Sequence, residues 1–127
     1  SASQDSSFGD KMKKLLKSTK FPANFDTKLD MSKVQMEAMM PWITQEVTKY
    51  LGFEDEVVIG YIEGQLSATT KVDPKEMQLS LMGFLEKNTT AFMAELWTLL
   101  LSAASNPAGI PNEFIERKKE ELRLKKE

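Results

Sequence analysis

The chain has 127 residues with a formal net charge of −2, 41% hydrophobic residues and 28% charged residues, which fits one globular domain with tails. It contains no Cys and no His, which excludes disulfides, Ser-His-Asp and Cys-His nucleophiles, and Cys/His zinc sites. No apolar stretch reaches the length of about 18 residues that a membrane span needs. We therefore expect an intracellular protein that is not an enzyme, with no membrane contact, cofactor, metal or small-molecule substrate.

Charge is distributed unevenly along the chain. Residues 11–20 carry five lysines and no acid, whereas residues 21–116 carry six lysines and fourteen Asp or Glu, a net charge of −8. Residues 117–127 carry six bases and three acids, a net charge of +3. The pattern predicts an acidic core between two basic segments, which the whole-chain charge conceals.

The first part of the chain is predicted to be a tail followed by a basic flank. Residues 1–9 are small and polar, so we expect them to be disordered. Residues 10–31 form the expected basic N-terminal flank. Within it, Asp10 is placed to cap a short helix that runs to about Ser18. A second short turn around Phe25 is expected to pack on the core.

Residues 32–115 are predicted to form a four-helix core. Ser32 and Gln35 have the spacing of a capping box, which predicts that the first core helix begins there. Pro41 lies inside this helix and should make it kink or restart, because proline has no amide hydrogen to donate. Gly52 is expected to end the helix as its C-terminal cap.

The second and third core helices carry their own start signals. Residues 54–56 (Glu-Asp-Glu) place acids in the first turn of the second helix, where the helix dipole favours them. Gly60 and Gly64 in that helix are expected to let a neighbouring helix approach closely. Asp73 caps the third helix, with Pro74 at its first position. The predicted buried face of the third helix consists of Met77, Leu81, Phe84 and Leu85.

The fourth helix is predicted over about residues 90–104, with Asn88 or Thr89 as its cap. It is apolar over most of its circumference, which is typical of the central helix of a bundle. A final helix begins near Asn112, and residues 116–127 form a charged C-terminal helix. With no strand periodicity, we predict an all-α fold: a four-helix bundle with short flanking N- and C-terminal helices.

The tripeptide Pro41-Trp42-Ile43 has no chemistry of its own, but it begins a recognisable order of segments. It is followed by Gly52-Phe53-Glu54-Asp55, by Phe84-Leu85, by Ala-Phe-Met-Ala-Glu-Leu-Trp at residues 91–97, and by Ala108-Gly109-Ile110-Pro111. This order closely resembles the PWI domain family, which is found at the N-terminus of the serine/arginine-repetitive nuclear matrix proteins that act as splicing coactivators. The resemblance covers nearly the whole chain.

The resemblance implies a nuclear four-helix bundle that binds RNA and DNA with little sequence preference, with other splicing or processing proteins as further partners. In the family, basic residues on both sides of the bundle take part in binding. The matching positions, which are our predicted nucleic-acid-binding residues, are Lys11, Lys13, Lys14, Lys17, Lys20, Arg117, Lys118 and Lys119. We interpret Pro41, Trp42 and Ile43 as a packing signature and not as a binding site.

Alternative interpretations stay open for the basic segments and for the function. The lysines of residues 11–20 either contact phosphates or form a solvated helix face, and the lack of any acid among them favours phosphates. For residues 117–119, local pairing with Glu116, Glu120 and Glu121 is an equal alternative. The alternative function is a protein-interaction module, in which a groove between helices docks a peptide or helix of another splicing factor.

Overall fold

The structure is a computed structural model that describes residues 2–126, and side-chain surroundings from Gly9 onward. Helices make up its regular structure, and residues 2–126 contain no strand. The elements are α1 (Ala2–Ser18), η1 (Ala23–Asp26), η2 (Met31–Lys33), α2 (Met36–Leu51), α3 (Glu56–Ser67), α4 (Pro74–Leu85), η3 (Glu86–Asn88), α5 (Thr89–Ala104) and α6 (Asn112–Lys126), where η marks a short 3-10 helix.

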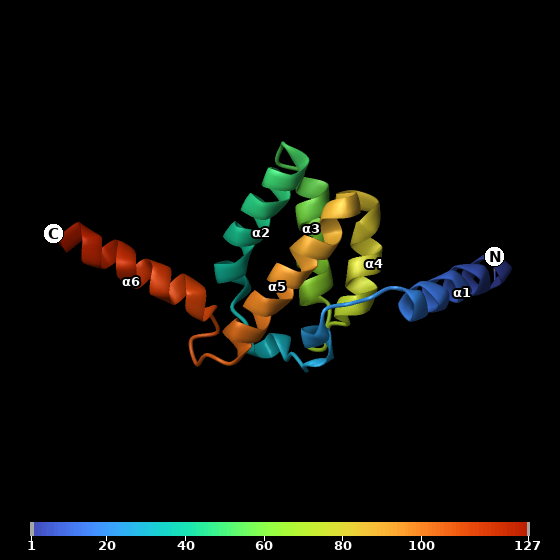
Figure 1. Cartoon of the computed structure of the whole chain (residues 1–127), viewed down its shortest axis with the longest axis horizontal. Coiled ribbons are helices and arrows are strands. Elements are labelled where there is room, and N and C mark those ends of the chain that lie inside the picture. Colours follow the sequence, from blue (N-terminus) through green and yellow to red (C-terminus); the bar gives the residue numbers. More distant parts are fainter. Residues whose placement is uncertain (1, 127) are drawn as a thin grey trace.

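Helices α2 to α5 form the central bundle, and α1 and α6 extend from it (Figure 1). This confirms the predicted all-α fold with a four-helix bundle. Neither flanking helix is short, since α1 has 17 residues and α6 has 15, against 16 for α2, and α1 is longer than its predicted range. None of the helices described is both long and apolar enough to cross a lipid bilayer.

Helix α1 begins at Ala2 and not at Asp10, so it takes in residues that were expected to form a disordered tail. The segment before Asp10 contains no proline, and Gly9 is its only residue with a strongly unfavourable helix propensity. Helix α6 begins at Asn112, as predicted, and continues into the charged segment of residues 116–126.

The start of α2 differs from the predicted capping box. Ser32 lies in η2, where its amide and hydroxyl both donate to the Asp30 carboxylate, at 3.0 and 2.7 Å. Gln35 takes the N-cap position of α2 without a side-chain cap bond, and its amide donates to the Gly109 carbonyl at 2.8 Å. Asp30 therefore outcompetes the expected cap, because a carboxylate two residues upstream is a strong acceptor for Ser32.

Pro41 does not interrupt α2, which runs unbroken from Met36 to Leu51. Its ring removes only the amide that would bond to the Glu37 carbonyl. Both residues are exposed, so water can satisfy that carbonyl. The predicted end of the helix is confirmed, since Gly52 has a φ of 86° and its amide donates to the Thr48 carbonyl.

Acidic side chains start α3 and α4: Asp73 caps α4 as predicted, whereas of residues 54–56 only Glu56 lies in the first turn of α3, with Asp55 as its N-cap. The Asp55 carboxylate accepts hydrogen bonds from the amides of Val57 and Val58, and the Asp73 carboxylate accepts from Lys75 and Glu76. Pro74 occupies the first turn of α4. Each cap satisfies two of the amides that a helix N-terminus leaves without a partner.

Two predictions about the surfaces of these helices are wrong. Gly60 and Gly64 are exposed, and a Cβ added to either would have nothing within 4 Å, so no helix approaches them. Phe84 is 37% exposed and lies beside Tyr61, with 5.2 Å between the ring centroids. The α4 positions Met77, Leu81 and Leu85 are buried as expected.

Helix α5 is central, as its apolar circumference predicted. It contacts α4, α6 and all three 3-10 helices. Phe92 in α5 stacks on Trp42 of α2 with 5.7 Å between the ring centroids. Ile43 is also fully buried, whereas Pro41 is exposed. Trp42 and Ile43 thus pack in the core, as their interpretation as a packing signature requires.

The segment from Phe21 to Val34, which we call the strap, crosses one end of the bundle. Its side chains Phe25, Leu29 and Met31 are buried. The indole of Trp97 donates to the Asn24 carbonyl at 2.9 Å, and the Met31 amide donates to the Thr70 carbonyl at 2.9 Å. The second half of the expected basic flank therefore contributes three side chains to the core.

The turn between α5 and α6 depends on Gly109. This buried glycine has a φ of 70°, and a Cβ placed there would lie 2.8 Å from the Lys33 carbonyl oxygen. Such a contact is with backbone and cannot be relieved by a side-chain rotation. Gly109 thus holds the turn against the segment that leads into α2.

We expect Gly109→Ala to lower the free energy of unfolding by at least about 1–3 kcal/mol, the typical energy of a strained backbone residue. The control is Gly64→Ala, which should raise it by up to about 1 kcal/mol because alanine favours a helix. Urea denaturation of both variants measures the difference. Equal effects would contradict the role assigned to Gly109.

Candidate nucleic-acid interface

The five lysines of residues 11–20 are all exposed. Lys11, Lys13, Lys14 and Lys17 lie on α1, and Lys20 follows the helix. Among the side chains that the structure describes, none of these five lysines takes part in an ion pair. Their charges are therefore available to an anion that approaches from solvent.

The lysines of α1 share one side of the helix. At about 100° per residue, Lys11, Lys13, Lys14 and Lys17 cover an arc of about 160°. The opposite arc holds Met12 and Leu16, which are half-buried. Lys11 and Lys17 are about 9 Å apart along the axis, so the four positive charges lie within two turns of the helix. The arrangement suits a run of phosphates along the helix.

The three predicted binding residues of α6, Arg117, Lys118 and Lys119, are arranged differently, because each has a partner. Lys118 pairs with Glu121 at 3.8 Å, Lys119 pairs with Glu116 at 3.5 Å, and the Arg117 guanidinium lies 5.8 Å from the centre of the Phe114 ring. The pairing that was left open as the alternative for these residues is thus present for both lysines. The pairs are exposed, so each contributes little to stability.

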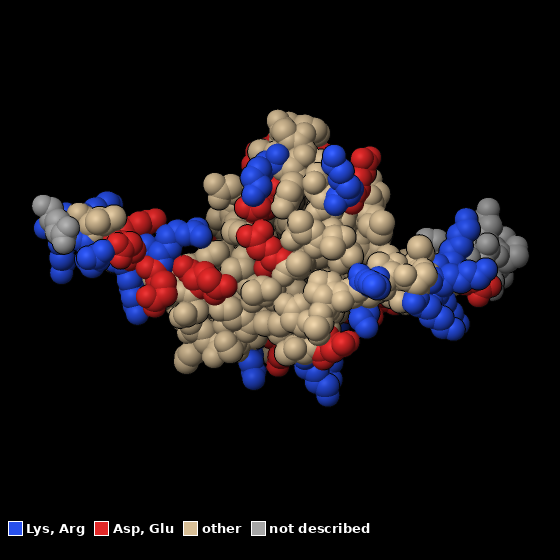
Figure 2. Space-filling view, viewed as in Figure 1, with Lys and Arg blue, Asp and Glu red and all other residues tan. Residues whose placement is uncertain are grey.

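The two basic helices do not form one surface. Helices α1 and α6 extend from opposite sides of the bundle, with the bundle between them (Figure 1). Figure 2 shows Lys and Arg gathered on α1, whereas Lys, Arg and acids alternate on α6. A nucleic acid that contacts both helices must pass across the bundle.

Acidic residues make the bundle a poor surface for phosphates. The segment of residues 21–116, which holds α2 to α5, has a net charge of −8. Lys49 on α2 is held by the Glu46 carboxylate at 2.7 Å, and this hydrogen bond raises the pKa of Lys49. Within residues 2–126 the acids form no cluster suited to a metal ion.

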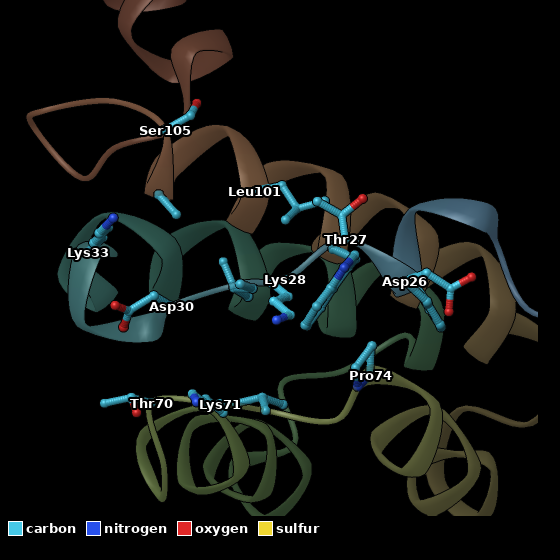
Figure 3. A pocket seen from close by; sticks show the side chains of 15 residues that line it. Asp26, Thr27, Lys28, Asp30, Lys33, Thr70, Lys71, Pro74, Leu101 and Ser105 are labelled. Carbon is cyan, nitrogen blue, oxygen red and sulfur yellow. The ribbon is translucent and has the colours of Figure 1, made fainter.

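A pocket under the strap was not predicted from the sequence. It has a volume of about 730 Å³ and lies between the strap, the loop that precedes α4, and the C-terminal half of α5 (Figure 3). Lys28, Lys33 and Lys71 line it together with Asp26 and Asp30. These lysines are scattered in the sequence, so no local charge run signals them.

The Asp30 carboxylate at this pocket is negatively charged. Its hydrogen bonds from the Ser32 hydroxyl and amide lower its pKa, and the nearby charges of Lys33 and Lys71 lower it further. Because these two lysines act on the same carboxylate from the strap and from the loop before α4, positive charge converges at this pocket.

Comparison with known proteins relates both the bundle and its flanks to one family. The family model of the PWI domain matches residues 37–108, which hold nearly all of α2 to α5. Serine/arginine repetitive matrix protein 1 of Gallus gallus is 55% identical over 124 residues. These residues cover 97% of this chain and 14% of the relative. The chain therefore corresponds to only a small part of that protein.

Proposed function

Because this chain belongs to the PWI domain family, we propose that it is the nucleic-acid-binding module of a nuclear pre-mRNA splicing or processing factor. It binds RNA and DNA through the phosphates, with little sequence preference. The observation that carries this proposal is the set of five exposed lysines at residues 11–20, none of which is paired with an acid among the side chains described.

The chemistry of these lysines supports phosphate contact more than base reading. An ammonium group is a point charge on a flexible stem, so it attracts a phosphate without fixing the geometry of a base edge. Each phosphate that is neutralised releases condensed counterions, which favours binding. The net charge of −8 on residues 21–116 repels phosphates and directs the nucleic acid to the flanks.

Helix α6 plays the smaller part in this proposal. A phosphate must replace Glu121 at Lys118 and Glu116 at Lys119. Exposed ion pairs are weak, typically about 0.2–1 kcal/mol, so a phosphate can replace the glutamate. The loss of the ion pair reduces the binding free energy that the new contact contributes. We therefore assign the main contact to α1 and a supporting contact to Arg117, Lys118 and Lys119.

A salt titration of binding to unrelated RNA and DNA oligonucleotides tests the proposal. With three to five phosphate contacts, the logarithm of the association constant should fall with the logarithm of salt concentration with a slope of about −2 to −3.5 on single strands and about −2.7 to −4.5 on duplex DNA. Oligonucleotides of scrambled sequence should bind alike. A slope near zero, or strong preference for one sequence, would refute the proposed mechanism.

A further inference from the structure

The pocket under the strap has an apolar interior and a charged rim. Its walls include Leu29 of the strap, Val72 of the loop before α4, and Pro74 at the start of α4. Leu101 and Ala104 of α5 complete the apolar lining. Figure 3 shows the labelled polar side chains Asp26, Lys28, Asp30, Lys33 and Lys71 around it. A volume of about 730 Å³ lies within the range of about 300–1,000 Å³ that is typical of binding pockets.

The walls of the pocket are held in place by hydrogen bonds between distant segments. The Met31 amide donates to the Thr70 carbonyl and so joins the strap to the loop before α4. At the other end of the strap, Asn24 is held by α5: its carbonyl accepts from the Trp97 indole, and its side-chain amide donates to the Thr98 hydroxyl at 3.1 Å. The pocket is therefore formed before any ligand binds, which lowers the entropy that binding costs.

The rim carries more free positive charge than negative charge. Lys28, Lys33 and Lys71 are exposed, and none of them has an ion-pair partner among the described side chains. Of the two rim carboxylates, Asp26 pairs with Lys75 at 3.3 Å. Asp30 accepts two hydrogen bonds from Ser32. With Asp26 paired to Lys75, three lysines stand against the single carboxylate of Asp30, so the mouth of the pocket carries a net positive charge.

We propose that this pocket docks an acidic segment of a partner protein, which inserts a large apolar side chain between the strap and α5. The apolar walls receive the side chain, and Lys28, Lys33 and Lys71 attract the acidic residues beside it. This interaction is independent of the proposed nucleic-acid contact, because the lysines of residues 11–20 do not line the pocket.

The lining of the pocket favours a peptide over a nucleotide. Trp97 is only 1% exposed and its ring meets Phe25 edge-on, so it offers no open face on which a base could stack. The remaining apolar walls are mainly aliphatic.

The test uses a labelled acidic peptide of about four helical turns with Leu and Phe on one face. Its two control peptides replace either the acids by Gln or the Leu and Phe by Ala, and an oligouridine is tested in parallel. Backbone amide chemical shifts of the whole chain locate each contact. We expect the acidic apolar peptide to shift amides of the strap, of residues 70–74 and of the end of α5, and both control peptides to bind more weakly.

Two variants of the protein test the lining and the rim. Ala104→Trp fills the pocket and should weaken binding of the acidic peptide by about tenfold or more, whereas Ala91→Trp, at an exposed position of the same helix, should not. Changing Lys28, Lys33 and Lys71 together to Gln should weaken binding by about tenfold. Changing Lys87, Lys125 and Lys126 to Gln also removes three positive charges, but at positions that do not line the pocket. This variant should bind the acidic peptide with unchanged affinity.

The rim variant keeps the test decisive if Ala104→Trp does not fold. The proposal is overturned if the acidic peptide shifts no pocket amides, or if both lysine variants bind it equally. It is also overturned if oligouridine shifts the pocket amides and the peptide does not, which would assign the pocket to nucleic acid.

Discussion

Changing Lys11, Lys13, Lys14, Lys17 and Lys20 together to Gln is expected to leave the bundle folded and to weaken binding to RNA and DNA of every sequence alike. All five side chains are exposed, and none of them belongs to the core. Each phosphate contact contributes about 0.9 to the logarithmic salt slope on duplex DNA and about 0.7 on single strands. If three to five of the lysines make contacts, the slope should decrease in magnitude by roughly 2–4.5 units.

A matched pair of triple variants separates α1 from α6. Lys13, Lys14 and Lys17 changed to Gln remove three charges, as do Arg117, Lys118 and Lys119 changed to Gln. We expect the α1 variant to lose more affinity, because Lys118 and Lys119 already pair with glutamates. Circular dichroism checks that both variants fold. A folded five-lysine variant with unchanged affinity and slope would remove α1 from the interface.

Trp97→Ala is expected to cause the largest loss of stability of any single substitution in the core. Trp97 is 1% exposed, and its indole donates to the Asn24 carbonyl. Truncating a buried Trp costs about 3–5 kcal/mol, and the loss of its hydrogen bond to the part-buried Asn24 carbonyl adds about 0.5–1.5 kcal/mol. The total is a large share of a typical domain stability of about 5–15 kcal/mol.

Urea denaturation followed by circular dichroism measures this loss, with two controls. Trp97→Phe keeps an aromatic ring but removes the hydrogen-bond donor, so its free energy of unfolding should lie between those of the parent and Trp97→Ala. Trp42→Ala loses the stacking on Phe92 but no hydrogen bond to any residue that the structure describes, so it should cost less than Trp97→Ala and still more than any single lysine change. If Trp42→Ala had the same free energy of unfolding as the parent but lost nucleic-acid binding, residues 41–43 would be a contact site.

Local signals predicted the bundle well, because they depend on residues close together in the sequence. Asp55, Asp73 and Gly52 act within four residues of the groups they cap, and the apolar circumference of α5 requires burial wherever the helix lies. The capping box failed because Asp30, just outside the motif, is a stronger acceptor for Ser32. The expected close approach at Gly60 and Gly64 failed because glycine spacing does not specify a neighbour.

The site was predictable only in part. The exposure of the lysines on α1 follows from their number and their lack of acids, and the ion pairs of α6 follow from helical spacing. The opposed directions of α1 and α6 depend on how the bundle packs, which no local pattern encodes. The pocket likewise combines Lys28, Lys33 and Lys71 from segments that are far apart in the sequence and are joined by contacts such as the Met31–Thr70 hydrogen bond.

The bond between the Trp97 indole and the Asn24 carbonyl gives the strap its own reporter in hydrogen exchange. The indole hydrogen is protected only while the strap lies on α5, so its exchange with deuterium measures local opening of the strap. Amides in the middle of α5 remain protected until the bundle itself unfolds. A gap between the two rates would give the free-energy difference between lifting the strap and unfolding the domain, and a ligand held under the strap should slow the indole exchange.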